Sequence, residues 1–253
     1  MNIVSTLNDE LLQQPFDKQS EEDSLLKECQ QIAYNYSKIE NSIAVLSDLK
    51  LNKSYIYNGG FAEQIGLPGK ENIKEINSIW EEEIFNKIHP DDLIEKHLLE
   101  LQFFHLLKTF PVESRSDYHI YSKMRMRDKS GEYVAIQHRM FYVANCASGN
   151  FWLSLCLYNY AYNNSLETFD KVIINSATGE IIRQDKQQCN NILSVREKEV
   201  LLLIEKGMMS KEIADRLSIS KNTVDRHRQN ILEKLRVKNS IEACRVAKLM
   251  DLV

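Results

Sequence analysis

The stretch 193–253 constrains the fold most, because it consists of short amphipathic segments that carry their own start and stop signals. Ser194 and Glu197 have the spacing of a capping box, which begins a helix. Gly207 offers the left-handed conformation that ends one, and Ser210 opens a second segment soon afterwards. Helices this short are stable only when their apolar sides pack on one another. We therefore expect a compact all-helical unit.

A capped turn separates the second segment from the third. Ser220 is placed to cap a third helix from about Lys221 to Leu235, and Ser240 is placed to cap a fourth. Small or apolar side chains are expected where the second and third helices meet, namely Ile213, Ala214, Leu217 and, in the turn, Ile219. Two short helices with such a contact cross at a fixed angle, which is the geometry of a helix-turn-helix.

The predicted third helix has two different faces. The face expected to pack inward carries Val224, His227, Ile231 and Leu235. The opposite face, called the recognition face below, carries Asn222, Asp225, Arg226 and Gln229. Polar side chains of these types hydrogen-bond base edges in the major groove of DNA. The sequence therefore predicts a DNA-reading helix and makes transcription regulation the leading hypothesis.

The motifs of this stretch resemble the LuxR-type DNA-binding domain. They are Leu193-x-x-Arg196-Glu197-x-Glu199-Val200-Leu201, Gly207, Lys211-Glu212-Ile213-Ala214, Ser220-x-x-Thr223-Val224-x-x-His227, Ile231-x-x-Lys234-Leu235 and Ala243-x-x-x-Ala247. The resemblance implies base contacts by Asp225, Arg226 and Gln229. It implies phosphate contacts by Lys211, Lys221, Thr223 and Arg228. Two residues depart from the family pattern: Asp225, where many relatives have a basic or neutral residue, and Asp251, which replaces a glycine.

The distribution of charge supports a division into two parts. From Leu193 onward there are 13 Lys or Arg against 9 Asp or Glu, whereas the preceding residues hold 19 against 27. The basic part is the one expected to meet phosphate. No apolar stretch is long enough to span a membrane, and the five cysteines form no Cys-x-x-Cys pair. We therefore expect a cytoplasmic protein with no membrane partner and no metal site.

The part before residue 193 predicts a mixed helix and strand domain, which makes the whole chain α+β. Apolar residues at helical spacing predict a helix over 21–40, and alternating apolar residues predict strands. The expected strands are 43–49, 54–57, 118–127, 133–144 and 151–158. A short helix is expected around 61–65, and 73–108 is expected to be mainly helical, with a fresh start at His89-Pro90. His89 is interpreted as a capping or turn residue rather than a haem ligand.

This order of an antiparallel sheet with flanking helices resembles a PAS sensor domain. The resemblance covers about residues 40–160 and rests on Tyr55-x-Tyr57-Asn58, Ile88-His89-Pro90-Asp91-Asp92 and Met124-Arg125-Met126-Arg127-Asp128-Lys129-Ser130-Gly131-Glu132-Tyr133-Val134. Such a domain holds a ligand or a partner between its sheet and helices. The candidate pocket residues are Tyr57, Phe61, Trp80, Met124 and Met126, although core packing explains the same residues.

The expected organisation has four parts. They are an N-terminal segment with an amphipathic helix (1–40), a PAS-like domain (41–162), a hairpin and linker (163–192) and a LuxR-type domain (193–253). The chain is expected to be a homodimeric regulator that binds double-stranded DNA, with RNA polymerase as a candidate further partner. The first domain either senses a small molecule, whose identity is unknown, or serves as a ligand-free assembly platform.

Two other classes of protein fit this sequence less well. An enzyme would use residues such as Asp91, His119 or His138, but no nucleophile, base and orienting group occur in a recognisable arrangement, so no catalytic residue is assigned. A polymerase subunit of the sigma type shares the helix-turn-helix, but it would need a helical domain where this chain has strands. Both readings are disfavoured.

Overall fold

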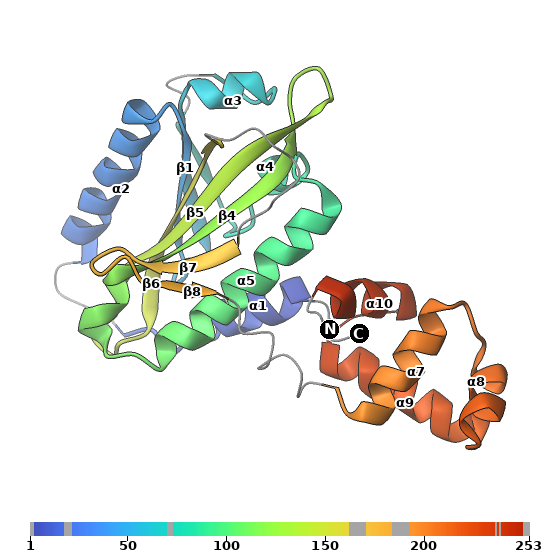
Figure 1. The fold of residues 1–253 in the computed structure, drawn as a ribbon. Coiled ribbons are helices and arrows are strands. Elements are labelled where there is room, and N and C mark those ends of the chain that lie inside the picture. Colours follow the sequence, from blue (N-terminus) through green and yellow to red (C-terminus); the bar gives the residue numbers. More distant parts are fainter. Residues whose placement is uncertain are drawn as a thin grey trace. The chain divides into compact units, whose positions relative to one another are not determined.

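The computed structural model describes residues 3–17, 22–69, 73–161, 171–183, 193–235, 237 and 239–249. The chain divides into two compact units (Figure 1). One unit is Asp9–Arg183, and the other combines Met1–Asn8 with Gln184–Val253. They are called the sheet unit and the helical unit below. Among the described residues, no helix is both long and apolar enough to cross a membrane.

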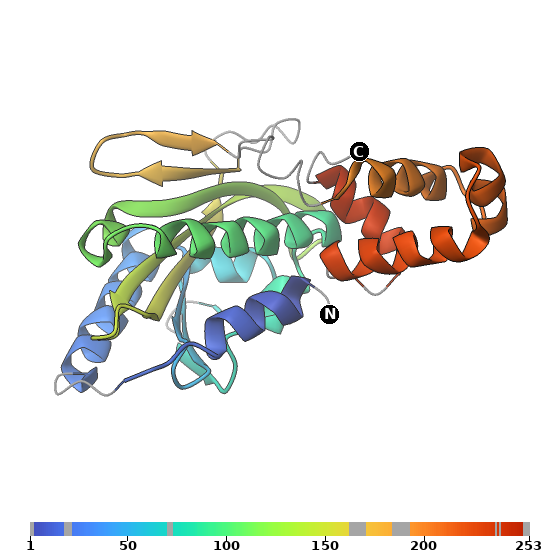
Figure 2. The ribbon, with the colours of Figure 1, turned by 90° about the horizontal axis from the view of Figure 1, so that it is seen from below.

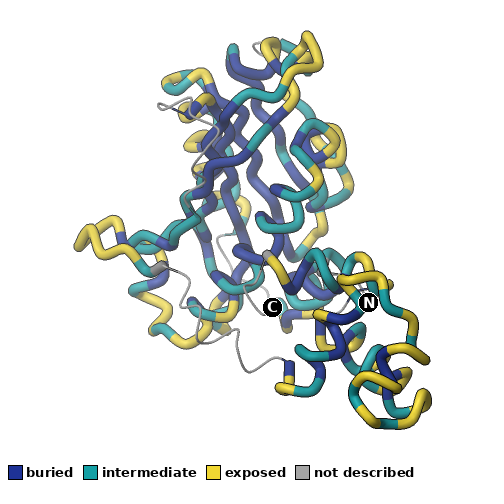
Figure 3. The backbone as a smooth tube through the Cα atoms, turned by 45° about the vertical axis from the view of Figure 1, so that its right-hand side comes forward, coloured by how far each residue is buried: buried dark blue, intermediate teal, exposed yellow. Residues whose placement is uncertain are grey.

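The sheet unit is built on one eight-stranded sheet of order β3-β2-β1-β6-β5-β4-β7-β8, in which every pairing is antiparallel. The strands are β1 (Ile43–Asp48), β2 (Lys53–Asn58), β3 (Ile73–Ile76), β4 (Tyr118–Arg127), β5 (Tyr133–Asn145), β6 (Phe151–Tyr160), β7 (Lys171–Asn175) and β8 (Ile181–Arg183). The expected hairpin after the main strands is confirmed as β7 and β8, and it extends the sheet at one edge (Figure 2). The central strands form the buried interior (Figure 3).

Helices surround this sheet. They are α2 (Glu22–Ile39), α3 (Gly60–Gln64), α4 (Glu82–Phe85), α5 (Pro90–Lys108) and the 3-10 helix η1 (Val112–Asp117). Helix α1 (Ile3–Leu12) is shared between the two units, because its residues up to Asn8 belong to the helical unit. The expected N-terminal amphipathic helix is confirmed as α2. The expected start at Pro90 is also confirmed, because His89 is the N-cap of α5 and its Nδ1 accepts a hydrogen bond from the backbone N–H of Asp91 at 3.2 Å.

The two faces of the sheet differ in chemistry. Successive residues of a strand point to opposite faces, so Ala44 and Leu46 of β1 face one side together with the buried residues Cys29 and Ala33 of α2. Ser47 of β1 points to the other side and contacts the Ser54 hydroxyl at 3.0 Å. On that second side, the side chains of β5 and β6 meet Glu100 of α5. Helices α2 and α5 therefore cover opposite faces, and the face under α5 is unusually polar.

Two expectations about the strands were wrong. Residues 73–76 form the edge strand β3 rather than helix, because pairing with β2 and the ion pair between Lys53 Nζ and Glu75 Oε1 at 2.6 Å outweigh the local helix preference. Alternation along 118–127 places Lys123 with His119, Tyr121 and Arg125 on the side of β4 expected to be wet, but only 5% of Lys123 is exposed.

The helical unit contains α7 (Val195–Glu205), α8 (Ser210–Leu217), α9 (Lys221–Leu235) and α10 (Ser240–Leu249). The capping box of Ser194 and Glu197 is confirmed, and Gly207 has the expected positive φ of 80°. The cap of the fourth helix was assigned wrongly. Asn239, not Ser240, caps α10, because the Asn239 side chain accepts from the backbone N–H of Glu242 at 2.9 Å.

The expected fold class is confirmed. The described residues form an antiparallel sheet with helices, followed by a helical C-terminal region, so the chain is α+β. The parts of the expected linker before and after the hairpin, 163–170 and 184–192, and the departure at Asp251 lie outside the described residues.

Candidate functional site

The recognition face of α9 is an exposed polar surface of the predicted helix-turn-helix. All four of its side chains, Asn222, Asp225, Arg226 and Gln229, are exposed. The opposite side of α9 buries Val224, Ile231 and Leu235 as expected, whereas His227 is only half-buried. The apolar stripe thus fixes the rotation of α9 about its axis, and it leaves the recognition face free of core packing.

Asp225 is held in the ionised form at the centre of this face. The Ser210 side chain, followed by Lys221, keeps the pKa of Asp225 below its usual value. Lys221 Nζ lies 3.3 Å from Asp225 Oδ2. Gln229 Nε2 donates to Glu233 Oε1 at 3.0 Å. An ionised Asp225 only accepts hydrogen bonds.

The turn between α8 and α9 is fixed by contacts at both ends. The Ser220 hydroxyl accepts from the backbone N–H of Thr223 at 3.0 Å, which confirms Ser220 as the cap of α9. Ser218 takes the left-handed conformation with φ 53°, and α8 ends there. Arg196 of α7 donates to the carbonyl of Leu217 at 2.8 Å, so it satisfies an acceptor left open at the end of α8.

Glu197 joins the first and third helices of this unit. It is 2% exposed, and its Oε2 accepts from the backbone N–H of Ser194 and from Lys234 Nζ, both at 2.7 Å. Burial opposes ionisation of Glu197, but the bonds from Lys234 and Ser194 lower its pKa overall. Lys234 is therefore engaged inside the domain, and its side chain is still 43% exposed.

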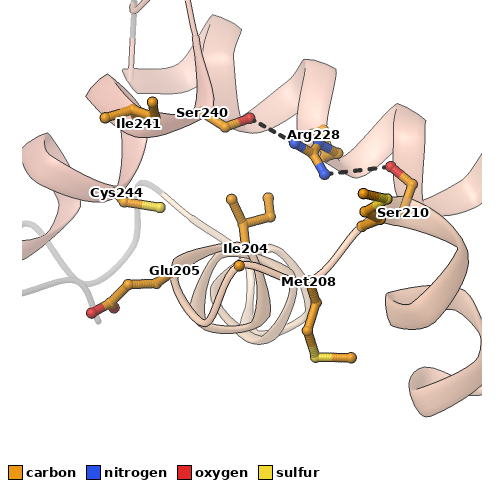
Figure 4. A pocket seen from close by; sticks show the side chains of 10 residues that line it. Ile204, Glu205, Met208, Ser210, Arg228, Ser240, Ile241 and Cys244 are labelled. Carbon is orange, nitrogen blue, oxygen red and sulfur yellow. Dashed lines mark hydrogen bonds between the residues drawn. The ribbon is translucent and has the colours of Figure 1, made fainter.

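Arg228 lies in a groove between the helices of this unit (Figure 4). Its guanidinium donates to Ser210 Oγ at 3.4 Å and to Ser240 Oγ at 3.0 Å. These two serines stand in the first turns of α8 and α10, where unpaired backbone N–H groups carry partial positive charge. Lys211 is exposed in the same first turn of α8. The groove itself is lined by one basic side chain, Arg228, and one acidic side chain, Glu205.

The structure does not bring the five predicted pocket residues of the sheet unit together in one cavity. Tyr57 belongs to the core cluster on the α2 side, where its ring contacts that of Tyr34. Phe61 is buried against Tyr160, and Met124 and Met126 are 1% and 0% exposed in β4. These four residues are part of the packed core.

Trp80 is the exception, because it lines a cavity of about 280 Å³ beside β2. The lining combines apolar and polar groups, including Ile56, Asn58, Trp80 and Glu81. The Asn58 side chain donates to the carbonyl of Pro68, while its buried Oδ1 has no hydrogen-bond partner among the described residues. Burial raises the pKa of Glu81 to about 7. One part of this cavity is apolar, and the other part is lined by polar and charged residues, namely Asn58, Lys74, Ser78, Glu81, Glu82 and Glu83.

A group of buried ionisable residues lies under α5. Glu100 Oε1 accepts from Lys96 Nζ at 2.6 Å, and Glu100 Oε2 lies 3.4 Å from His97 Nδ1. Burial opposes the charge on Glu100, but Lys96 and His97 hold its pKa well below the usual value. Burial lowers the pKa of His138 to about 3, so this histidine is neutral, and burial raises the pKa of the Cys156 thiol.

This group was missed in the sequence, where no metal site was expected. Glu100, His138 and Cys156, called the interior cluster below, each offer one ligand atom, and these atoms lie within 4.8 Å of one another. No short motif links the three residues. A signal was nevertheless present, because charged residues such as Lys96 and Glu100 interrupt the apolar side of the predicted helix.

Comparisons with known proteins concern mainly the helical unit. Residues 191–247 match the family described as "Bacterial regulatory proteins, luxR family". The oxygen regulatory protein NreC of Staphylococcus carnosus is 37% identical over 91 residues, which are 32% of this chain and 42% of that protein. The transcriptional regulatory protein DesR of Bacillus subtilis is 57% identical over 53 residues, 21% of this chain and 27% of that protein. The chain thus spans less than half the length of these relatives.

The helical unit therefore carries a LuxR-type helix-turn-helix domain. The relatives are by name regulatory proteins. A solved dimer of VqmA from Vibrio cholerae is 16% identical, covers 88% of each chain and has a TM-score of 0.30. That likeness is too weak to support a conclusion about the sheet unit.

Proposed function

We propose that this chain is a sequence-specific DNA-binding transcription regulator. The observation that carries the proposal is the recognition face, which lies exposed on α9 within a LuxR-type domain. In this proposal α9 enters the major groove, and Asp225, Arg226 and Gln229 contact base edges. Their exposed side chains need no rearrangement of the core to do so.

Phosphate contacts are assigned to the edge of the same surface. The residues are Lys211, Lys221, Thr223 and Arg228. Lys211 and Lys221 are exposed, and both stand in first turns of helices, where an anion is favoured. Thr223 and Arg228 are already bonded to serines of the unit, so we propose that they contact phosphate while holding these bonds.

The test is selection of bound sequences from a random pool of duplex DNA by the full chain. We expect enrichment of a defined sequence that loses definition when Asp225, Arg226 and Gln229 are all replaced by Ala. The matched control replaces Glu212, Asp215 and Arg216, which are exposed on α8 outside the recognition face. If the DNA bound by the unaltered chain showed no enriched sequence, sequence-specific binding would be refuted.

We propose that the sheet unit senses a small molecule in the cavity lined by Trp80. Its unpartnered Asn58 Oδ1 and the buried Glu81 supply polar groups for such a ligand. The alternative is a ligand-free assembly platform, and the exposed apolar residues Ile32, Tyr36 and Ile39 of α2 favour it. Repeating the selection with and without cell extract separates the two, because only a sensor changes its DNA binding in response to extract.

A homodimer is proposed in either case. One groove-entering helix reads too few base pairs to distinguish a site in a genome, so two copies are needed on one operator. Candidate contacts between copies are the exposed side of α2 and the outer side of α10, where Ile241 is 84% exposed.

A further inference from the structure

The interior cluster assembles three different ligand atoms from three elements of the sheet unit. Glu100 comes from α5, His138 from β5 and Cys156 from β6. The register pairs His138 with Tyr158 and Met140 with Cys156, so His138 and Cys156 lie on the same face of neighbouring strands. All three residues are buried, and their ligand atoms lie within 4.8 Å of one another.

The imidazole of His138 is oriented as a metal-binding histidine is. Its Nδ1 lies 3.2 Å from the Ser122 hydroxyl, which can accept the ring N–H. Its Nε2 has no hydrogen-bond partner among the described residues, although it lies 3.9 Å from Glu100 Oε1. Metal-bound histidines usually donate their second ring nitrogen to such a partner, which fixes the tautomer and turns the lone pair toward the ion.

The chemistry of the donor set selects the class of ion. An imidazole nitrogen, a thiolate sulfur and a carboxylate oxygen suit Zn²⁺ and neighbouring transition metals, whereas Ca²⁺ and Mg²⁺ prefer oxygen alone. Ligands at the usual bond lengths of a tetrahedral ion lie roughly 3.3–3.8 Å apart. The described atoms, which lie within 4.8 Å of one another, therefore need to approach by at most about 1–1.5 Å. Three protein ligands leave one coordination position open.

Charge around the cluster decides whether a dication is tolerated there. Lys96 opposes the ion, but it also hydrogen-bonds Glu100 and fixes the orientation of that carboxylate. Glu81 is 4% exposed and interacts electrostatically with Lys96 and Glu100. With Cys156 as a thiolate and Glu81 ionised, as it is above its raised pKa of about 7, the negative charges of Glu81, Glu100 and Cys156 balance Lys96 and a divalent ion. An interior of balanced charge avoids the large cost of an isolated buried ion.

We infer that Glu100, His138 and Cys156 form a binding site for a divalent transition-metal ion, with one coordination position open to water or a small ligand. The site goes beyond the proposed function, because it lies in the sheet unit and does not depend on DNA binding. It also gives a reason why the fold retains charged and unpartnered groups in its core, where apolar residues would be less costly.

Cobalt is the probe for this site, because a Co²⁺–thiolate bond produces a near-ultraviolet charge-transfer band. The experiment uses the full chain without an affinity tag, treated with a chelator and kept reduced, and titrated with Co²⁺ in the absence of DNA. We expect one equivalent to bind, with a charge-transfer band and the visible bands of a low-coordinate cobalt site. Zn²⁺ added afterwards should displace Co²⁺, so that the charge-transfer band and the visible bands both disappear. Absence of a charge-transfer band in the unaltered chain would overturn the inference.

Substitutions locate the site. Cys156→Ser should abolish the charge-transfer band, and His138→Gln should weaken Co²⁺ binding by at least about tenfold. Cys29→Ser and His119→Gln are matched controls, since both residues lie outside the interior cluster, and they should change the affinity by less than about twofold. Circular dichroism checks that each variant is folded. A band that survives Cys156→Ser, or disappears with Cys29→Ser, would place the metal elsewhere and refute the inference.

A stability measurement keeps the test decisive if His138→Gln fails to fold. An ion that binds only the folded chain raises its melting temperature in proportion to the logarithm of ion concentration. Zn²⁺ should therefore stabilise the unaltered chain and the Cys29→Ser variant, and it should leave Cys156→Ser unchanged. Equal stabilisation of all three would refute the site, whether or not the chain binds DNA.

Discussion

Arg226 is the exposed guanidinium of the recognition face, so it carries the sharpest prediction about base readout. A bidentate contact between arginine and guanine discriminates against other bases. Arg226→Ala should therefore cost about 1–3 kcal/mol on the preferred site and hardly change binding to random DNA. The measurement is the dissociation constant for both kinds of duplex at one fixed salt concentration.

Lys211→Ala is the companion measurement, because a phosphate contact carries no sequence information. It should weaken binding to specific and random DNA alike, and lower the slope of log affinity against log salt by about one. If Arg226→Ala and Lys211→Ala both lowered specific and random binding equally, Arg226 would not be a base reader.

Glu197 makes the stability of the helical unit depend on pH. Its carboxylate has a lower pKa in the folded chain than the ordinary value of 4.5, because the bonds from Lys234 and Ser194 outweigh burial. Such a group adds stability that is present above the unfolded pKa and is lost as the pH falls through the folded pKa. The free energy of unfolding of this unit should thus fall as the pH drops below about 4.5.

Glu197→Gln tests this explanation. It should lower the free energy of unfolding by about 1–3 kcal/mol at pH 7, because the Lys234 ammonium loses its charged acceptor. It should also flatten the loss of stability in acid, as measured by denaturant titration of the segment 187–253 at several pH values. The control is Glu199→Gln, at an exposed position. An equal effect of both substitutions would show that Glu197 is not the cause of the pH dependence.

At the level of elements, the turn between α8 and α9 combines a strained residue with a capping residue. Ser218 has a φ of 53°, which costs an L-residue about 1–2 kcal/mol and costs glycine almost nothing. Glycine also makes the unfolded chain more flexible, which offsets about 0.4–1 kcal/mol of the gain. Ser218→Gly should therefore raise the free energy of unfolding by roughly 0.5–1 kcal/mol.

The same substitution two positions later should have the opposite sign. Ser220 has no positive φ, and its hydroxyl accepts from Thr223. Ser220→Gly should therefore destabilise the unit by a few tenths of a kcal/mol or more. Denaturant titration of both variants gives the comparison. Destabilisation by Ser218→Gly would show that the serine side chain has a role beyond the backbone conformation.

At the scale of the whole molecule, the proposed regulator should place two copies on one inverted repeat. The centres of the half-sites are expected about one helical turn apart, because each α9 must enter the major groove from the same side of the duplex. Mass measurement of the complex at saturating protein gives the number of protomers. One protomer per duplex would contradict the dimer.

The sensor proposal predicts coupling between the two units. A ligand changes DNA affinity only through its different affinity for two states of the protein, and the coupling is reciprocal. Trp80→Ala and Met124→Trp, both within the sheet unit, should therefore change operator affinity. The isolated segment 187–253 should fold and bind a half-site weakly whatever the extract contains. If both variants fold and bind the operator unchanged, with or without extract, the assembly platform is the better description.

The sequence by itself determined those features that depend on residues close together in the chain. Ser194 with Glu197, Gly207, and Ser220 with Thr223 act within a few residues, so their patterns predict the boundaries of α7 and α9. The recognition face follows from helical periodicity in the same way. Alternation predicted β4, β5 and β6, because the apolar and polar residues that mark the two faces of a strand alternate within its own sequence.

Only the tertiary structure decided which distant residues meet. The register of β5 and β6 brings His138 and Cys156 together, and the packing of α5 on the sheet adds Glu100. Residues 73–76 form a strand because they pair with the edge of β2. No local sequence pattern indicates this pairing. Trp80 lines a cavity while Met124 and Met126 fill the core. The physical reason is that helix caps and periodicity are short-range, whereas burial and convergence depend on contacts between elements far apart in the sequence.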